Sequence, residues 1–242
     1  MAEQPQGSRD VADGVISGAA SGPPRTSRHL EIAGPQGRLE AIMETPDGDP
    51  PAAAVLCHPH PLHGGTMHNK VVYRAAKGAV AAGLPCLRFN FRGVGQSDGR
   101  HDGGEGELGD LRAAVDHMES CFPGLPLLVG GFSFGAAVGL RFGVMDPRVT
   151  ALVGLGLPMS RTCFDFLEDD MRPLLLLHGE SDPFGAPGDL RALADRRRGP
   201  VSLVLYPGQG HFLEDVLPEM TAEVTKFCRA LWAAGDPGEK IP

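Results

Sequence analysis

The sequence predicts an α/β fold in which helices cover both faces of a mostly parallel sheet. From Ser27 onward, short apolar runs rich in Val, Leu and Ala alternate with longer helical stretches. Alternation of this kind is typical of parallel sheets. No linker is long enough to divide the core, so we expect one domain over residues 27–234, between a weakly ordered N-terminal tail at 1–26 and a C-terminal tail at 235–242.

The individual elements follow from their periodicity. Residues 38–44 alternate between apolar and polar side chains, as a half-buried strand does, whereas residues 52–57 are apolar throughout, as a strand buried on both faces is. Residues 105–121 repeat their apolar positions every three or four residues, which indicates an amphipathic helix. We expect further strands at 84–90, 125–130, 149–156, 173–177 and 201–206, and further helices at 70–82, 134–145, 187–198 and 213–232.

The composition is that of a globular, acidic protein. The 242 residues include 22 basic and 30 acidic side chains, a formal charge of −8, which disfavours binding to nucleic acid. Basic residues come singly apart from the triplet at 196–198, which we expect to be the solvated end of a helix. The 34 glycines exceed the average share and predict many tight turns or close backbone approaches.

Cysteine usage and hydropathy favour a reducing compartment. Five scattered cysteines without a Cys-x-x-Cys pair predict neither a disulfide framework nor a zinc ribbon. No run reaches about 18 uninterrupted apolar residues, and we find no signal-peptide pattern near the start of the chain. We therefore expect a cytoplasmic protein with no membrane span.

The strongest chemical signal is the pentapeptide Gly-Phe-Ser-Phe-Gly at 131–135, which lies between an expected strand and an expected helix. A nucleophilic serine requires this context, because it must sit on a sharp strand-to-helix turn that glycines on either side make room for. The start of the helix then supplies N–H groups where an oxyanion would form. We therefore expect Ser133 to be a nucleophile rather than an ordinary turn residue.

A serine nucleophile needs a base, and that base needs an orienting carboxylate. In this architecture the order is Ser, then Asp or Glu, then His, each on a loop after a later strand. Asp182 and His211 follow the strands expected at 173–177 and 201–206. We expect Asp182 to orient His211 and His211 to take the proton of Ser133.

Other carboxylates lie near the same strand ends. They are Glu180, Asp165, Asp169 and Asp170. We expect these to be solvated surface groups, as charged side chains usually are.

A loop with four histidines follows the strand at 52–57 and permits two interpretations. The histidines at 58, 60, 63 and 68 suggest a metal site, but their spacing in a proline-broken loop does not match a zinc template. Alternatively, this loop supplies an oxyanion donor. Pro59 and Pro61 have no N–H, so the amide of His60 is the preferred donor, with Leu62 second. The other donor is the amide of Phe134, and we assign no residue to a metal.

A second glycine-rich loop, at 89–99, is expected to be architectural. Its glycines allow tight turns after a strand, and Arg92 and Asp98 are expected to lock it through charge-assisted hydrogen bonds. It lacks the Gly-Lys-Ser/Thr ending of a phosphate-binding loop.

These motifs resemble the α/β-hydrolase superfamily from about Ser27 to Trp232. The His-Pro-His-Pro loop at 58–61 and the runs at 64–71 and 91–95 are similar to small bacterial serine hydrolases akin to dienelactone hydrolases. The resemblance implies an eight-stranded sheet and carries Ser133, Asp182 and His211 over as the catalytic triad. Dienelactone hydrolases use a cysteine nucleophile, and haloalkane dehalogenases and epoxide hydrolases use an aspartate, so a serine at 133 disfavours those substrates and reactions.

Such hydrolases often carry a helical cap after the sixth strand. Here only residues 157–172 separate two strands, which is too short for a cap domain. We expect an open site, with Phe164, Phe166 and Leu167 forming at most one wall of an acyl pocket. An open site favours small to medium acyl groups.

The resulting hypothesis is a lidless carboxylesterase that uses no cofactor and acts on small-molecule esters. Thioester and amide substrates would use the same machinery. A metal-dependent hydrolase built on the histidine loop and a non-catalytic binding module remain alternatives.

Overall fold

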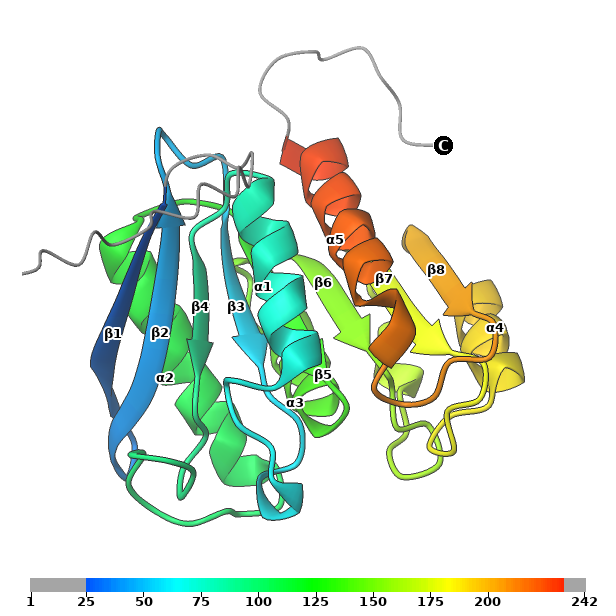
Figure 1. The fold of residues 1–242 in the computed structure, drawn as a ribbon, viewed down its shortest axis with the longest axis horizontal. Helices are drawn as coiled ribbons and strands as arrows, with labels where there is room; N and C mark the ends of the chain where they lie inside the picture. Colours follow the sequence, from blue (N-terminus) through cyan, green and yellow to red (C-terminus); the bar gives the residue numbers. More distant parts are fainter. Residues whose placement is uncertain (1–24, 233–242) are drawn as a thin grey trace, which may run out of the picture.

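The protein is built on one eight-stranded sheet, with the strand order β1-β2-β4-β3-β5-β6-β7-β8 (Figure 1). The structure is a computed structural model, and it describes residues 25–232. Strand β2 is antiparallel to both of its neighbours, and β3 to β8 are parallel. This confirms the predicted mostly parallel sheet. The strands are β1 (Arg25–Gly34), β2 (Gly37–Pro46), β3 (Ala53–Cys57), β4 (Cys86–Phe89), β5 (Leu127–Phe132), β6 (Val149–Leu155), β7 (Leu174–Gly179) and β8 (Val201–Tyr206).

Helices cover both faces of the sheet, as predicted. Apolar side chains of α1 and α5 pack into one buried cluster, and those of α2, α3 and α4 pack into another on the opposite face (Figure 1). No helix within residues 25–232 is long and apolar enough to cross a membrane. The helices are α1 (Lys70–Ala81), α2 (Glu105–Cys121), α3 (Phe134–Met145), α4 (Pro187–Arg196) and α5 (Leu217–Trp232), with 3-10 turns η1 (Pro61–His63), η2 (Asp165–Leu167) and η3 (Glu214–Val216).

Strand β1 is an element that the sequence analysis did not expect. It pairs with β2 along its whole length, from Arg25 opposite Pro46 to Gly34 opposite Gly37. The two strands form a hairpin closed by the turn of Pro35 and Gln36, and Gly37 directly after it has φ 119°, a backbone conformation that favours glycine. The tails expected at 1–26 and 235–242 lie outside the described residues, except that Arg25 and Thr26 belong to β1.

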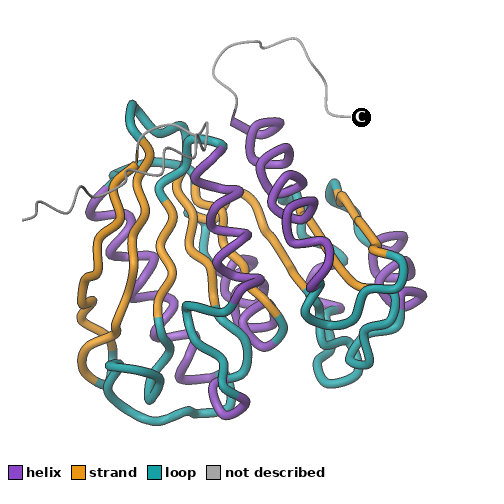
Figure 2. The backbone as a smooth tube through the Cα atoms, in the orientation of Figure 1, coloured by secondary structure: helices purple, strands orange, loops and turns teal. Residues whose placement is uncertain are grey.

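Connections at the carboxyl ends of the parallel strands gather along one edge of the sheet (Figure 2). The segment between β6 and β7 holds only the turn η2, so no large cap is present there, in agreement with prediction. The wall that we expected from this segment is mostly absent. Phe164 and Leu167 are buried in the core, and only Phe166 is partly exposed.

Arg92 and Asp98 of the second glycine-rich loop form charge-assisted hydrogen bonds, as expected. The guanidinium of Arg92 binds Asp110 of α2 through Nε and Nη2, at 2.9 and 2.8 Å, whereas Asp98 accepts from the amide of Arg38 on β2. The loop is architectural, but its partners lie far away in sequence.

The basic triplet at 196–198 is only partly solvated, contrary to expectation. Arg197 is buried and donates to the carbonyl oxygen of Pro200 and to Asp170.

Candidate active site

Ser133 occupies the turn between β5 and α3, as the pentapeptide predicts. Its backbone has φ 55° and ψ −118°, a left-handed region that non-glycine residues rarely adopt. A conformation of this kind costs on the order of 1–3 kcal/mol and persists only where surrounding structure holds it. Here the amide of Ser133 donates to the carbonyl oxygen of Leu155 on β6, at 2.9 Å. The half-buried serine is thus held at the carboxyl edge of the sheet.

The flanking glycines make this turn possible because other backbone passes very close to them. A Cβ on Gly135 would lie 2.3 Å from the carbonyl oxygen of His58 and 2.5 Å from that of Cys57. A Cβ on Gly131 would lie 2.4 Å from the same Cys57 oxygen. Strand β3 and the loop after it therefore pack directly against the serine turn. This contact brings the histidine loop to Ser133.

Asp182 and His211 meet at the ends of β7 and β8. Oδ2 of Asp182 accepts a 2.6 Å hydrogen bond from Nδ1 of His211, and its Oδ1 accepts from the amide of Phe184 at 2.8 Å. Both side chains are buried. Because Nδ1 is the donor to the carboxylate, the neutral imidazole presents an unprotonated Nε2, which is the form a general base needs.

The competing carboxylates are engaged elsewhere. Each forms an ion pair with an arginine: Glu180 with Arg191, Asp165 with Arg196, Asp169 with Arg198, and Asp170 with Arg172 and Arg197. None of them contacts His211 among the described residues.

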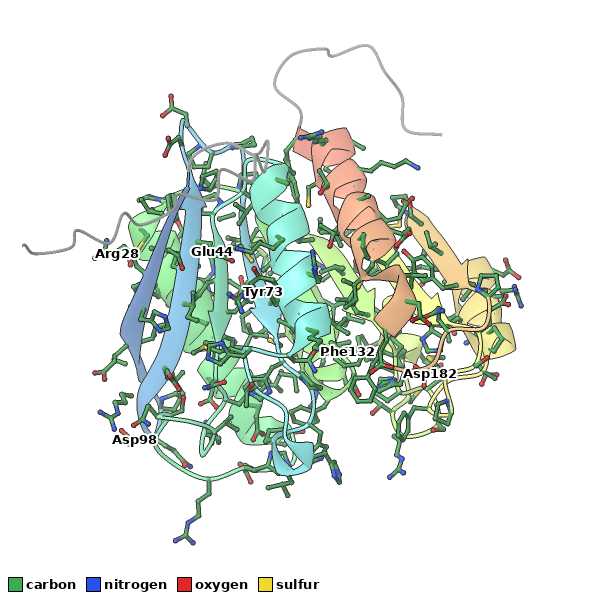
Figure 3. The ribbon with its side chains drawn as sticks, viewed as in Figure 1. Arg28, Glu44, Tyr73, Asp98, Phe132 and Asp182 are labelled. Atoms are coloured by element: carbon green, nitrogen blue, oxygen red, sulfur yellow. The ribbon has the colours of Figure 1, made fainter. Side chains whose placement is uncertain are left out.

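His211 lies beside the strand that carries Ser133. Its ring is 4.7 Å from that of Phe132, the residue immediately before the serine. Phe132 and Asp182 are labelled in Figure 3. A Cβ on Gly156, directly after β6, would be 3.3 Å from Cε1 of His211. Within residues 25–232 the Ser133 hydroxyl makes no hydrogen bond, and catalytic hydrogen bonds often tighten only when substrate binds.

The two amides proposed from the sequence as oxyanion donors are unused. Among the described residues, neither the N–H of His60 nor that of Phe134 donates to another protein group. The rings of these two residues are 5.0 Å apart, so the loop after β3 and the start of α3 face each other. The second choice, the amide of Leu62, already donates to Nδ1 of His60 at 3.2 Å. The geometry therefore favours His60.

His58 holds this loop in place, a role that the sequence analysis missed. The imidazole is fully buried, donates through Nδ1 to the carbonyl oxygen of Pro59 at 2.6 Å, and accepts through Nε2 from the amide of Phe91 at 3.0 Å. Burial lowers its pKa to about 4, because a buried cation lacks solvation. The neutral ring thus joins the loops after β3 and β4 immediately before His60.

The other three histidines of the loop do not gather around a common point with His58. His60 and His63 pack ring to ring at 4.6 Å, and His68 lines a separate cleft. Over residues 25–232, no group of three or more His, Cys, Asp or Glu side chains is placed to hold a metal ion.

Two further histidines, the buried His178 and the partly buried His101, lie near the site. Nε2 of His178, at the end of β7, donates to the carbonyl oxygen of Gly185 at 2.8 Å and lies 3.7 Å from Oδ2 of Asp182. His101 binds the buried carboxylate of Glu107 at 2.8 Å, and its ring packs 5.4 Å from that of Phe134. Neither carries a sequence motif that separates it from an ordinary core residue.

A cleft of about 370 Å³ opens between the start of α1 and the segment before α5, and Ser133, Asp182 and His211 do not line it. Phe212, which is 51% exposed, forms part of its wall together with Asn69, Lys70, Glu214 and Leu217. The ring of Phe212 is 5.4 Å from that of His211.

Together, the fold and these side chains define a class of protein. A serine on a strained strand-to-helix turn, followed by an Asp–His pair on the loops after β7 and β8, is the arrangement of an α/β hydrolase. A family model described as serine aminopeptidase, S33, matches residues 50–162. Protein RP471 of Rickettsia prowazekii is 32% identical over 203 residues, which cover 80% of this chain and 85% of that protein.

Solved structures agree with this class. An α/β serine hydrolase homologue from Coxiella burnetii is 35% identical, with a TM-score of 0.77 and coverage of 82% of this chain and 96% of that one. A lidless α/β serine hydrolase from Xanthomonas campestris is 32% identical, with a TM-score of 0.79 and coverage of 87% and 97%. This chain belongs to the α/β-hydrolase superfamily. That membership supports hydrolase activity.

Proposed function

We propose that the chain is a carboxylesterase that works through an acyl-enzyme on Ser133. Oγ of Ser133 attacks the acyl carbon while Nε2 of His211 takes its proton, and the same proton then goes to the leaving alcohol. Asp182 orients the imidazole and stabilises its cation. Water then repeats the sequence on the acyl-enzyme, and no cofactor is required.

Oxyanion stabilisation falls to two backbone amides. The N–H groups of Phe134 and His60 are both unused within the described residues, and they belong to segments that face each other. In a site of this kind, each such donor contributes about 3 kcal/mol to stabilisation of the transition state. The observation that carries the proposal is the 2.6 Å Asp182–His211 hydrogen bond beside a serine held at φ 55°.

Covalent labelling tests the nucleophile directly. We expect a fluorophosphonate to label the wild-type protein at Ser133 and to leave Ser133→Ala unlabelled, because only an activated serine reacts. Ser160→Ala is the matched control, since Ser160 is an exposed serine whose amide donates to Phe184 in the same region, and it should label like wild type. Equal labelling of wild type and Ser133→Ala would contradict the assignment, and so would no labelling of wild type.

The open site predicts a preference for short acyl groups. The segment between β6 and β7 holds only the turn η2, so it does not enclose a long acyl chain. In a series of nitrophenyl esters we expect kcat/KM to peak at about two to six acyl carbons. Burial of a methylene group would contribute roughly 0.8 kcal/mol to binding, but additional methylenes remain in water here and contribute nothing. A peak at long acyl chains would contradict this.

Thioesterase and amidase activities use the same side chains and remain alternatives. Nothing in the site distinguishes an ester oxygen from a thioester sulfur or an amide nitrogen. Wild type and Ser133→Ala, assayed on matched esters, thioesters and amides, would rank the three activities. A non-catalytic binding module would hydrolyse none of them.

A further inference from the structure

Arg161 lies at the rim of the candidate active site. It follows β6 in a short loop that is tied to the β7–β8 side, because the amide of Ser160 donates to the carbonyl oxygen of Phe184. The guanidinium lies over the ring of Phe184, 5.7 Å from its centroid, and that ring is 4.7 Å from the ring of His211. The cation is thus anchored on an aromatic side chain that touches the candidate general base.

The charge of Arg161 is not neutralised by the protein. It has no carboxylate within ion-pair distance among residues 25–232, and its side chain is exposed. Arginines on the neighbouring segments do have such partners. Arg172, Arg191, Arg196 and Arg198 each pair with an Asp or Glu. In a chain of net charge −8, an arginine left without a partner at this position is available to a ligand.

The opposite side of the site offers a hydrogen-bond donor. Burial lowers the pKa of His60, and the charges of His101, His63 and Arg161 add to this effect while that of Glu107 opposes it, so the ring is neutral near pH 7. Nδ1 of His60 accepts from the amide of Leu62, which leaves the proton on Nε2 as a donor. The carboxylates of Asp182 and Glu107 are already hydrogen-bonded to His211 and His101.

We propose that Arg161 binds a free carboxylate of the substrate, so that the preferred esters are half-esters of short dicarboxylic acids. The planar guanidinium matches a carboxylate with two parallel hydrogen bonds, and the Phe184 ring holds it ready for them. The ester group of the same molecule would then lie at Ser133. This proposal rests on the proposed esterase function and adds its substrate class.

A pair of substrates that differ only in charge tests the proposal. We compare kcat/KM for monomethyl glutarate, which is charged, with kcat/KM for dimethyl glutarate, which is neutral. We expect Arg161→Gln to lower the ratio of the first to the second about tenfold, mainly by raising KM for monomethyl glutarate, because the lost contact is charge-assisted. The neutral diester should be hydrolysed at the wild-type rate. Arg28→Gln is the matched control. It removes an exposed arginine on the edge strand β1, far from Asp182 (Figure 3), and should leave the ratio unchanged.

A conservative variant and a second substrate separate a carboxylate contact from a purely structural role of Arg161. Arg161→Lys keeps the charge and should retain part of the preference, which should weaken as salt increases. 4-Acetoxybutyrate carries its carboxylate on the alcohol side. A stronger Arg161-dependent preference for it would overturn the half-ester assignment. If Arg161→Gln slows both glutarate esters equally, Arg161 only supports Phe184 and the proposal is wrong.

Binding separates this proposal from the esterase proposal. In the Ser133→Ala protein, calorimetry should show that monomethyl glutarate binds about tenfold more weakly after Arg161→Gln. Arg161-dependent binding without hydrolysis by wild type would overturn the esterase function alone. Hydrolysis without any Arg161-dependent preference or binding would overturn the carboxylate site alone.

Discussion

Replacing Ser133 by alanine is expected to lower kcat for ester hydrolysis by about 10⁵-fold or more, and Asp182→Asn by about 10⁴-fold. Asparagine keeps the shape of the side chain, but its NH₂ group favours the wrong tautomer of His211, whose Nδ1 now donates to Oδ2 at 2.6 Å. Because Ser133, Asp182 and His211 act as a unit, the double variant Ser133→Ala/Asp182→Asn should be no slower than Ser133→Ala alone. Steady-state kinetics on one short ester would measure kcat for the two single variants and the double variant.

The coupling and its controls make this prediction specific. Glu180→Gln changes a carboxylate two residues away that pairs with Arg191, so it should keep a nearly wild-type rate. Thermal unfolding would show whether each variant is folded. Additive losses in the double variant would mean that Ser133 and Asp182 do not belong to one catalytic unit.

The second large effect is on stability. We expect His58 alone to remove on the order of 3 kcal/mol from the free energy of unfolding as the pH falls from 6.5 to about 4. The folded-state pKa is lowered below the unfolded value, so in this window the unfolded chain binds the proton and the native state does not. The stabilisation is therefore present above pH 6.5 and is lost on acidification. Protonated Nε2 would face the N–H of Phe91, donor against donor.

Urea unfolding at several pH values would measure this. His58→Asn retains a donor for the carbonyl of Pro59 but cannot titrate. We expect its free energy of unfolding to be lower than that of wild type at pH 7 and to fall less steeply on acidification, because the contribution of His58 is absent. The other histidines are unchanged and serve as the background. A wild-type slope in the variant would assign the effect to another group. An NMR titration of His58 would check its pKa of about 4 and its Nδ1-protonated form.

Much of the fold could be predicted because local pattern and tertiary role coincide. Helices α2 and α3 begin and end at the predicted residues, since apolar spacing in one and the serine pentapeptide before the other mark them locally. Strand β1 was missed because its alternation is weak and its stability comes from pairing with β2. The expected end of α4 was also imprecise, because Arg197 leaves the helix to enter a buried network.

The candidate site divides in the same way. The order of Ser133, Asp182 and His211 along strand ends could be predicted, because carboxyl ends of parallel strands share one edge. The roles of His58 and of the Arg92–Asp110 pair could not be predicted, since their partners lie 33 and 18 residues away in sequence. Only distances in the folded chain show that such pairs exist.

By itself, then, the sequence determined the class of fold, the strand-end positions of Ser133, Asp182 and His211, and the absence of donors at Pro59 and Pro61. These depend on periodicity, chain order and covalent structure, which are local properties. The tertiary structure decided which amide of the histidine loop is unused, which histidine holds that loop, and which arginine at the rim has no carboxylate partner among residues 25–232. Those properties depend on what lies next to each group in space, and residues distant in sequence supply it.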